Sequence, residues 1–380
     1  MRIAIDARYL NAHYSGIAKY SENLLNSLAK VDQENEYTVF IHTSFTRRLR
    51  LGENFRVVTY PALPVSMRTL FSFGQRVRRA KCDFLHSLSP MAPLLGIKRM
   101  ILTIHDLNLL NPEESPERAA PPLFRGGRAA FFQRLAMPHF IRSATWLMTV
   151  SEATKNSLSQ YFPSSEHKTI VIRSGVEETY CSPPEDALLQ LVHKNLKLPQ
   201  NYLLYIGTAS PNKNLPRMLR AFGRVRQQHP DTLGSLKFIL ALGHDKLPPE
   251  CQRIVRDMDL DEHIRILGPV TEEEKRVLYA RATLLFSVTR GEGFGLPIVE
   301  AQASGLPVLA GADAAVPEVT CGSALLVNPG DEDLITEKLR MILTDADLRA
   351  QFAQLGRENV KRFSWETTAQ RVVEIYNLLM

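Results

Sequence analysis

An α/β protein made of two Rossmann-like, doubly wound domains is the fold that the sequence predicts. Short apolar runs alternate with amphipathic helical segments along most of the chain, and a polar stretch around Pro183-Pro184 interrupts this alternation near its middle. The chain has 380 residues, which is more than the roughly 100–200 residues of one domain. Since parallel neighbouring strands need a connection long enough to hold a helix, the alternation indicates parallel sheets with right-handed crossovers.

The N-terminal domain is expected over residues 1–183. Its strands are expected at Arg2–Ala7, Tyr37–His42, Phe55–Tyr60, Phe84–Ser87, Met100–His105, Thr145–Val150 and Thr169–Ile172. Helical segments lie between several of them, at Ile17–Lys30, Arg68–Lys81, Phe124–Ile141 and Glu152–Tyr161. An order of strand and then helix is typical of a Rossmann-like domain.

The C-terminal domain is expected over residues 184–362. Its strands are expected at Tyr202–Ile206, Lys237–Ala241, Ile264–Leu267, Leu284–Val288 and Pro307–Ala310. A helical pattern then runs from Asp331 to Leu379 and is interrupted around Arg362–Ser364, where Ser364 can cap a last helix. Doubly wound domains bind ligands at the carboxyl ends of their strands, so we expect the chemistry there and between the domains.

Composition excludes several classes of protein. With 44% hydrophobic and 23% charged residues, the chain is neither collagen-like nor disordered, and its four distant cysteines form no zinc spacing or redox pair. Uncharged runs are short, such as the 11 residues of Ser87–Ile97, and none approaches the roughly 20 residues of a membrane-spanning helix. The start of the chain shows no secretion signal, so we expect a cytoplasmic protein.

Basic residues gather in the N-terminal half. Residues 47–99 hold 11 Lys and Arg against 2 Asp and Glu, and Phe71 and Phe73 lie among arginines on one expected helix. A basic amphipathic helix can bind an anionic membrane, which would make the protein peripheral to the inner face of the membrane; the alternative is a solvated basic face. Nucleic-acid binding is not expected, because stacking positions and groove-reading motifs are missing from the pattern.

The most informative segment is Arg290–Ala301, which joins an expected strand to an expected helix. Three glycines at 291, 293 and 295 allow a close backbone approach, and Pro297 suits the first turn of a helix that begins at about that residue. A helix start of this kind can bind a phosphate or diphosphate. Glu292 and Glu300 can accept hydrogen bonds from hydroxyls on either side, as a sugar and a ribose offer; the alternative is a tight turn with a helix-start charge.

This segment resembles the hallmark of glycosyltransferase family 4, the retaining, nucleotide-sugar-dependent group 1 enzymes with the GT-B fold. Their two glutamates have seven residues between them, and Glu292 and Glu300 match both. Further landmarks follow in family order: Ile3–Asp6, Ser15–Ile17, Ile104–Leu107, Val150–Glu152, Tyr205–Thr208, Lys213-Asn214, Val316–Val319 and Phe363–Trp365. The resemblance covers nearly the whole chain and implies that the last helix, residues 363–380, returns to the N-terminal domain.

The resemblance also implies roles for the C-terminal residues. Glu292 contacts hydroxyls of the donor sugar, Glu300 holds the nucleotide ribose, and Lys213 neutralises the departing diphosphate. The amides that line the sugar and diphosphate are those of Gly293, Phe294, Gly295 and Leu296. Family members often carry an arginine before the lysine, where this chain has Asn212, so Lys213 acts alone or with Arg217 or Arg290.

In the N-terminal domain, the resemblance implies that His105 contacts the transferred sugar near its reacting carbon and that the amide of Gly16 approaches the diphosphate. Asp106 can equally cap the next segment, and His86, also at a strand end, is a weaker candidate. Metal chemistry is not expected, because the three Asp-x-Asp sequences, at 257–259, 331–333 and 345–347, lie in polar helical surroundings and suit solvated faces or caps.

The function predicted is glycosyl transfer with retention, from a UDP- or GDP-linked sugar to a saccharide or lipid-linked saccharide in polysaccharide assembly. No cofactor other than this nucleotide-sugar substrate is expected. The acceptor is expected on the N-terminal domain and the donor on the C-terminal domain. The alternatives are a nucleotide-sugar epimerase of the same fold and a non-catalytic, two-lobed binding or scaffold protein.

Overall fold

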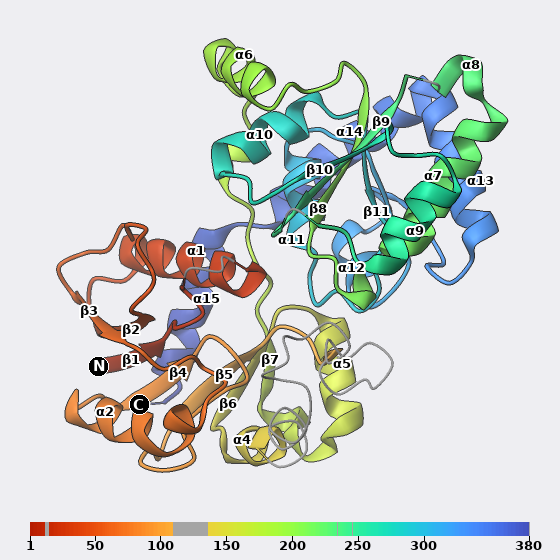
Figure 1. Ribbon diagram of the computed structural model, residues 1–380. Coiled ribbons are helices and arrows are strands. Elements are labelled where there is room, and N and C mark those ends of the chain that lie inside the picture. The colour runs from red at the N-terminus through yellow and green to blue at the C-terminus, as the bar shows by residue number, and fades with distance from the viewer. Residues whose placement is uncertain (12–14, 109–135, 234, 245, 380) are drawn as a thin grey trace. The chain divides into compact units, whose positions relative to one another are not determined.

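The computed structural model describes residues 1–379 except 12–14, 109–135, 234 and 245 (Figure 1). The chain divides into two compact units. Among the described residues, the N-terminal unit holds those up to Gly175 together with those from Phe363 onward, and the C-terminal unit is Val176–Arg362. Each unit contains one parallel sheet with helices around it, as the sequence predicts.

The N-terminal unit is built on a seven-stranded sheet in the order β3-β2-β1-β4-β5-β6-β7, and every described pair of strands is parallel. The strands are β1 Arg2–Asp6, β2 Glu36–His42, β3 Phe55–Tyr60, β4 Phe84–Ser87, β5 Met100–Ile104, β6 Trp146–Thr149 and β7 Thr169–Val171. The helical segments are α1 Gly16–Val31, η1 Thr69–Phe73, α2 Gly74–Arg79, α4 Met137–Ser143, α5 Glu152–Tyr161, η6 Pro163–Lys168 and α15 Trp365–Asn377. Most of the expected helix Phe124–Ile141 lies outside the described residues.

The C-terminal unit is built on a six-stranded parallel sheet in the order β10-β9-β8-β11-β12-β13. The strands are β8 Tyr202–Gly207, β9 Lys237–Leu242, β10 Ile264–Leu267, β11 Leu284–Ser287, β12 Val308–Gly311 and β13 Leu325–Val327. The helical segments are η7 Glu178–Tyr180, α6 Asp186–Asn195, η8 Pro211–Lys213, α7 Leu215–Gln228, α8 Pro230–Leu233, α9 Pro249–Asp257, α10 Glu272–Arg281, α11 Leu296–Ala303, α12 Val316–Thr320, α13 Glu332–Thr344, α14 Ala346–Asn359 and η9 Val360–Arg362. The sequence analysis missed β13.

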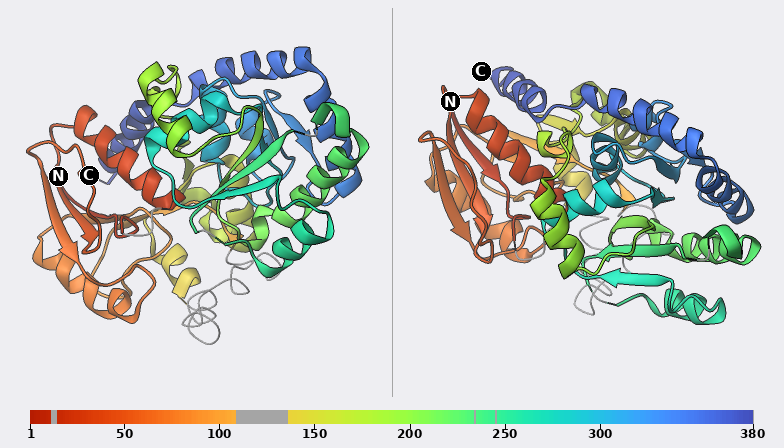
Figure 2. Two further views of the ribbon diagram at one scale, coloured as in Figure 1. Left: turned by 45° about the horizontal axis from the view of Figure 1, so that its top comes forward. Right: turned by 90° about the horizontal axis from the view of Figure 1, so that it is seen from above.

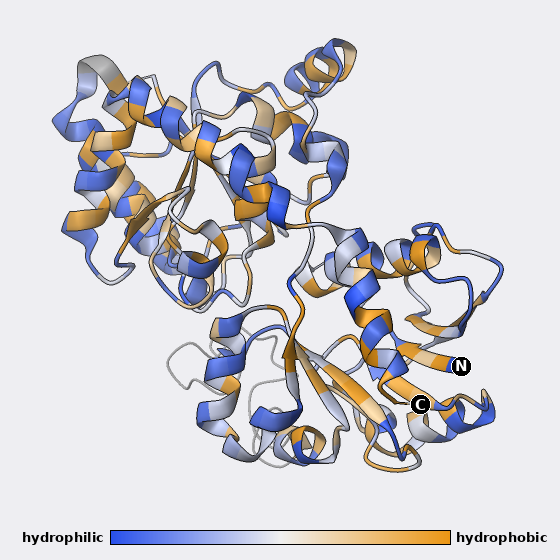
Figure 3. Cartoon of the chain, turned by 180° about the vertical axis from the view of Figure 1, so that it is seen from behind, coloured by the Kyte–Doolittle hydropathy of each residue, from blue (hydrophilic) through white to orange (hydrophobic). Residues whose placement is uncertain are grey.

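Burial explains why the central strands read as unbroken apolar runs. The side chains of Ile3, Ala4 and Ile5 in β1 are fully buried, since helices cover both faces of a parallel sheet. In Figure 3 the strands are mainly hydrophobic, whereas the helices carry hydrophilic residues on one side. Among the described helices, none is both long enough and apolar enough to span a membrane.

The boundary between the units differs from the one expected at residue 183. It lies between Gly175 and Val176, because the segment that follows packs into the C-terminal unit. The ring of Tyr180 is buried, and its centroid lies 5.7 Å from that of Tyr279 in α10. The proline pair that marks the linker in the sequence therefore follows the first elements of the second unit.

The last helix, α15, belongs to the N-terminal unit and lies beside α1 (Figure 2). The ring of Trp365 is 5.4 Å from that of Tyr20 in α1, and the hydroxyl of Thr368 donates to the carbonyl of Arg173 (2.8 Å). A Cβ at Gly175 would lie 2.2 Å from the backbone nitrogen of Trp365, so this close approach requires glycine.

Candidate functional site

In the C-terminal sheet, β8 and β11 are neighbours at the point where the strand order reverses. The chain continues from β8 to β9 on one side and from β11 to β12 on the other. Doubly wound sheets bind ligands at such a point, at the carboxyl ends of the strands. Lys213 lies in the loop after β8, and Glu292 lies in the loop after β11. The topology thus places Lys213 and Glu292, two of the residues predicted to contact the donor, in neighbouring loops.

The loop after β11 turns sharply into α11. Gly295 caps the helix with φ of +89°, in the left-handed region that favours glycine, and Pro297 lies in the first turn. The helix begins at Leu296, one residue before the predicted start. In this turn Pro297 has no amide hydrogen and the amide of Ile298 donates to the carbonyl of Gly295 (2.9 Å), and the positive end of the helix dipole lies at Leu296. This is an arrangement that can bind an anion.

Lys213 and Glu292 form an ion pair across the two loops. The distance from Lys213 Nζ to Glu292 Oε1 is 2.6 Å. The side chains are 19% and 18% exposed, so each is partly removed from water and still reachable by a ligand. A cation and a carboxylate therefore lie in contact at the switch point of this sheet.

Two buried asparagines connect the same loops. The carbonyl of Asn212 accepts a hydrogen bond from the amide of Arg290 (2.7 Å). Asn214, which has a left-handed backbone with φ of +58°, donates from Nδ2 to the carbonyls of Val288 (3.0 Å) and Pro329 (2.9 Å). These contacts fix the loop that carries Lys213 against the loop that carries Glu292.

The sequence analysis treats Asn212 only as a replaced arginine and gives Asn214 no role. The structure shows that both asparagines hold the loops, and the signal in the sequence was their position directly beside Lys213. Arg217, one of the two candidates for a second cation, donates from Nη1 to Asn214 Oδ1 (3.1 Å).

Glu300 lies one turn inside α11 and is buried, with 4% of its surface exposed. Its Oε2 accepts a hydrogen bond from the hydroxyl of Tyr279 (2.9 Å) and lies 3.7 Å from Nζ of Lys275, both in α10. Burial, strengthened by the charge of Glu300, raises the pKa of Tyr279 well above its ordinary value, so the hydroxyl remains a donor. Both of these contacts are made by Oε2.

A second layer of contacts supports Lys275. Its Nζ lies 2.9 Å from Glu272 Oε1, and Glu272 Oε2 accepts a hydrogen bond from the hydroxyl of Tyr180 (2.8 Å). Tyr180 is in the segment that enters the C-terminal unit. Tyr279 and Lys275 of α10 thus hold the buried carboxylate of Glu300. The contact between Glu272 and Tyr180 in turn holds α10 to this segment.

In the N-terminal unit, His105 directly follows β5. Its Nε2 lies 3.0 Å from the carbonyl oxygen of Leu88, and its ring contacts Tyr20 edge to face at 4.7 Å. Since a carbonyl only accepts, Nε2 carries the hydrogen and Nδ1 of the neutral ring is an acceptor. Burial lowers the pKa of His105 to about 4. His105 is therefore uncharged at neutral pH.

His86 is fully buried, so the interpretation of this residue as a ligand contact is wrong. Its Nδ1 lies 2.7 Å from the hydroxyl of Tyr376 in α15, and its Nε2 lies 2.9 Å from Thr103 Oγ1. Burial lowers the pKa of His86 to about 3. This histidine joins the last helix to the sheet.

Gly16 begins α1 behind a capping Ser15, whose Oγ accepts from the amide of Ala18 (3.3 Å). A Cβ at Gly16 would meet no atom within 4 Å among the described residues, so packing alone does not require glycine here. Asp106 accepts a hydrogen bond from the amide of Asn108 (3.1 Å), and the segment that it was expected to cap lies outside the described residues from 109 onward.

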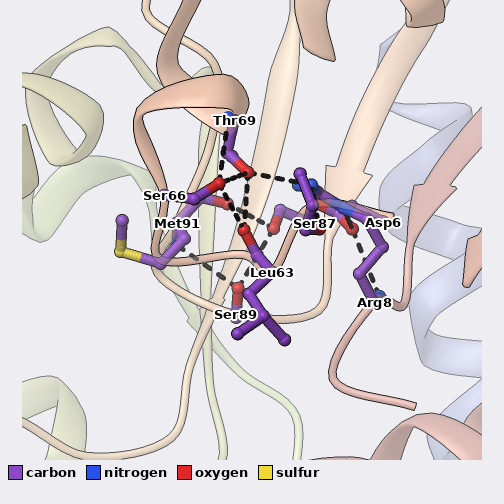
Figure 4. Close-up of polar contacts among 9 residues, drawn as sticks. Asp6, Arg8, Leu63, Ser66, Thr69, Ser87, Ser89 and Met91 are labelled. Carbon is purple, nitrogen blue, oxygen red and sulfur yellow. Dashed lines mark hydrogen bonds and ion pairs between the residues drawn. The ribbon is translucent and has the colours of Figure 1, made fainter. Parts of the chain in front are cut away.

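A buried ion pair at the end of β1 escaped the sequence analysis (Figure 4). Arg8 has no exposed surface and donates from Nε and Nη2 to the two oxygens of Asp6, both at 2.7 Å. Its Nη1 donates to the carbonyl of Ala62 (3.0 Å) and to Thr69 Oγ1 (2.8 Å), and its guanidinium lies 3.7 Å from the centre of the Phe73 ring. Arg8 thereby fixes the segment before η1 against the sheet.

Two of the Asp-x-Asp sequences are helix caps, as predicted. Asp331 accepts from the amide of Leu334 at the start of α13, and Asp345 accepts from the amide of Leu348 at the start of α14, both at 2.9 Å. Among the residues that the structure describes, no three His, Cys, Asp or Glu side chains are grouped so that they could hold a metal ion.

Two parallel Rossmann-like units with a helix start and acidic side chains at a switch point define the GT-B class of fold. Solved structures share it. Sucrose-phosphate synthase from Thermosynechococcus elongatus superposes with a TM-score of 0.74 and 19% identity, covering 100% of this chain and 99% of the other. HepE from Anabaena, solved in complex with UDP-glucose, gives 0.75 and 16%, covering 99% of each chain.

The sequence places the chain within this class. Residues 14–180 match the model of Glycosyltransferase Family 4, and residues 190–359 match the model of Glycosyl transferases group 1. The chain therefore belongs to the group 1 glycosyltransferases of family 4 and is a glycosyltransferase. O-antigen chain mannosyltransferase B from Escherichia coli is 26% identical over 399 residues, covering 100% of both proteins. O-antigen chain mannosyltransferase RfbU from Salmonella typhimurium is 25% identical over 308 residues, covering 81% of this chain and 75% of the relative.

Proposed function

We propose that this glycosyltransferase moves a sugar, with retention at the anomeric carbon and without a metal ion, from a nucleoside diphosphate to a saccharide or lipid-linked saccharide. The C-terminal unit binds the donor and the N-terminal unit binds the acceptor. The observation that carries the proposal is the contact of Lys213 with Glu292 at the switch point, next to the start of α11. The two O-antigen relatives support a place in polysaccharide assembly.

Each donor group meets a different part of this site. The diphosphate lies against the amides of Gly293, Phe294, Gly295 and Leu296 and the ammonium of Lys213, which together stabilise the charge that develops on the leaving group. Glu292 accepts hydrogen bonds from sugar hydroxyls. Oε1 of Glu300 accepts from a ribose hydroxyl, while Oε2 stays with Tyr279 and Lys275.

On the acceptor side, the proposal assigns contacts near the reacting carbon to His105, with an approach to the diphosphate by the amide of Gly16. A neutral His105 offers Nδ1 as an acceptor for a sugar hydroxyl, since Nε2 is used by Leu88. Positioning and electrostatic stabilisation carry the reaction, and no cofactor besides the nucleotide sugar takes part.

A thermal-shift experiment tests donor binding. UDP, GDP, UDP-glucose and GDP-mannose are added in turn to the wild-type protein and to Glu300→Ala. At least one nucleotide is expected to raise Tm of the wild type, and Glu300→Ala should lose most of that rise. Glu358→Ala on α14 is the matched control, because Glu358 is an exposed glutamate. The proposal is wrong if none of the four compounds binds, or if Glu300→Ala keeps the full shift.

Two further measurements test the chemistry. Product analysis by NMR gives the anomeric configuration of the new linkage, which should equal that of the donor. Activity should be unchanged after dialysis against EDTA. An inverted product would overturn retention, and a loss of activity that added Mg²⁺ or Mn²⁺ restores would overturn metal independence.

The proposal also includes contact with an anionic membrane through the N-terminal unit. Among the exposed large apolar side chains of this unit, Leu63, Met67, Phe71 and Leu95 are 44% to 62% exposed. The amide of Leu94 donates to the carbonyl of Leu70 (3.0 Å), which brings the segment of Leu95 next to that of Phe71. Exposed basic residues lie in the same segments, at Arg68, Arg76, Arg78, Arg79, Lys98 and Arg99. Phe73, which the sequence analysis placed on this face, is instead buried beneath Arg8.

Flotation with liposomes tests this contact. The wild type should float with phosphatidylglycerol vesicles at low salt and not with phosphatidylcholine vesicles, since arginines are attracted to anionic lipid. Phe71→Asp should abolish flotation, whereas Leu355→Asp on α14 should not, although Leu355 is exposed to a similar degree. Failure of the wild type to float with phosphatidylglycerol would contradict the membrane contact and leave the donor chemistry untouched.

A further inference from the structure

The ion pair between Lys213 and Glu292 joins the two groups that the proposed function assigns to different parts of the donor. The chain contains a useful comparison: Lys361 and Glu358 in the α14 region are also 2.6 Å apart, but their side chains are 69% and 63% exposed. Those of Lys213 and Glu292 are 19% and 18% exposed. Because water and salt screen a partly buried pair less, the Lys213–Glu292 contact is the stronger of the two.

A diphosphate competes with Glu292 for this lysine. The ammonium of Lys213 is the cation that the proposal assigns to the leaving group, and the carboxylate of Glu292 already occupies it at hydrogen-bond distance. The asparagine contacts hold both loops in place, so the two side chains do not separate by loop movement alone. Binding of phosphate oxygens to Lys213 therefore requires the carboxylate to give up at least part of its contact.

We propose that this ion pair lets the protein distinguish an intact donor from the nucleoside diphosphate that remains after transfer. The inference rests on the proposed donor site. In an intact donor, the sugar hydroxyls bind Glu292 and the diphosphate binds Lys213. When the ion pair breaks, both side chains therefore gain a new contact with the donor. A nucleoside diphosphate takes Lys213 but offers nothing to Glu292, which leaves a partly buried carboxylate without its cation. The pair thus weakens product binding more than donor binding.

Calorimetric titration with UDP, GDP, UDP-glucose and GDP-mannose tests the inference. For the nucleotide that the wild type binds, Glu292→Gln should bind the nucleoside diphosphate about 3- to 10-fold more tightly, because Lys213 loses its charged competitor. The same variant should bind the intact sugar donor no more tightly, or more weakly, because the amide is a poorer acceptor for sugar hydroxyls. The ratio of the two affinities therefore falls in this variant.

Simple repulsion between Glu292 and the diphosphate would also be relieved by Glu292→Gln, so a double-mutant cycle is needed. With Lys213→Met there is no ion pair to break, and adding Glu292→Gln should give a smaller gain in diphosphate affinity than it does in the wild type. An equal or larger gain in the Lys213→Met background would show that repulsion alone is at work and would overturn the inference.

Two controls separate the possible failures. Glu358→Gln removes the same charge from the exposed pair and should leave both affinities unchanged; a similar gain there would assign the effect to net charge and overturn the inference. Circular dichroism confirms that each variant is folded. If Lys213→Met does not weaken diphosphate binding at all, the proposed donor role of Lys213 fails together with the inference. If Lys213→Met weakens it while Glu292→Gln changes nothing, the donor site stands and the inference alone fails.

Discussion

At the switch point of the C-terminal sheet, Lys213 and Glu292 form an ion pair that remains partly exposed, whereas the ion pair of Asp6 and Arg8 at the carboxyl end of β1 in the N-terminal sheet is buried. Lys213 and Glu292 are accessible to a ligand. Asp6 and Arg8 have at most 1% of their side chains exposed, and His105 is neutral because burial lowers its pKa. Two sheets of similar strand order therefore carry either a partly exposed or a buried ion pair at this edge, depending on the loops that follow the strands.

This difference is consistent with the proposed positions of the donor and the acceptor. A nucleotide diphosphate is an anion that is stabilised by a cation and by amide donors, and a sugar hydroxyl needs neutral donors and acceptors. The N-terminal half is nonetheless the basic one, with 23 Lys and Arg against 15 Asp and Glu in residues 1–180. Among the residues of that unit that the structure describes, exposed arginines such as Arg68 and Arg78 lie directly before η1 and in α2, and so in other segments than His105, which follows β5.

The largest expected effect is on kcat and concerns the partly exposed ion pair of the C-terminal sheet. Lys213→Met should lower kcat by about 10²- to 10³-fold, because it removes the cation assigned to the leaving diphosphate. His105→Gln should lower kcat less, since a neutral ring contributes hydrogen bonds and no charge. The measurement is the rate of nucleoside diphosphate release from the donor that raises Tm most. Equal losses in the two variants would break the proposed contrast between the two sheet edges.

The second largest effect is on stability and concerns the buried ion pair of the N-terminal sheet. Arg8→Met should lower the free energy of unfolding by about 3–5 kcal/mol, because it leaves Asp6 buried without its cation. Adding Asp6→Asn should recover part of this loss, as removing both charges leaves no unpaired one. Urea unfolding followed by circular dichroism measures both. A loss below about 1 kcal/mol for Arg8→Met would mean that the buried pair does not hold the segment before η1.

Much of the fold could be predicted from the sequence where a local pattern carries it. Apolar runs gave the strands, and the glycines and Pro297 predicted the start of α11 to within one residue. Contacts between distant residues left no such pattern. Arg8 reaches Ala62 and Thr69 only because the sheet brings them together, and Asn214 joins three loops for the same reason. Phe73 is likewise covered by Arg8, and His86 contacts Tyr376 of α15, so both contacts join segments that are distant in the sequence.

A smaller effect concerns the contacts that hold Glu300. Tyr279→Phe removes one of the two groups next to Glu300 Oε2 and should weaken donor binding by about 3- to 10-fold. The loss should be smaller for a 2′,3′-dideoxy nucleotide, because that compound lacks the hydroxyls assigned to Glu300. Tyr202→Phe is the matched control, since its buried hydroxyl donates to the carbonyl of Leu278 (2.9 Å). Equal losses for both nucleotides would indicate a general packing defect and no ribose contact.

The smallest expected effect is on the pH dependence of stability and concerns His105 in the N-terminal unit. Because burial lowers the pKa of His105 from 6.5 to about 4, the unfolded state takes up a proton at this residue before the folded state does. Its contribution to stability is therefore fully present above pH 6.5 and is lost as the pH falls from there toward 4. His105→Gln should flatten the decline in Tm over this interval relative to the wild type, and should leave Tm above pH 7 almost unchanged. His167→Gln, at an exposed histidine, should keep the wild-type slope. If the decline in Tm with falling pH is unaltered in His105→Gln, His105 is accessible to protons in the folded state. The proposed difference between this residue and the charged residues of the C-terminal sheet would then be wrong.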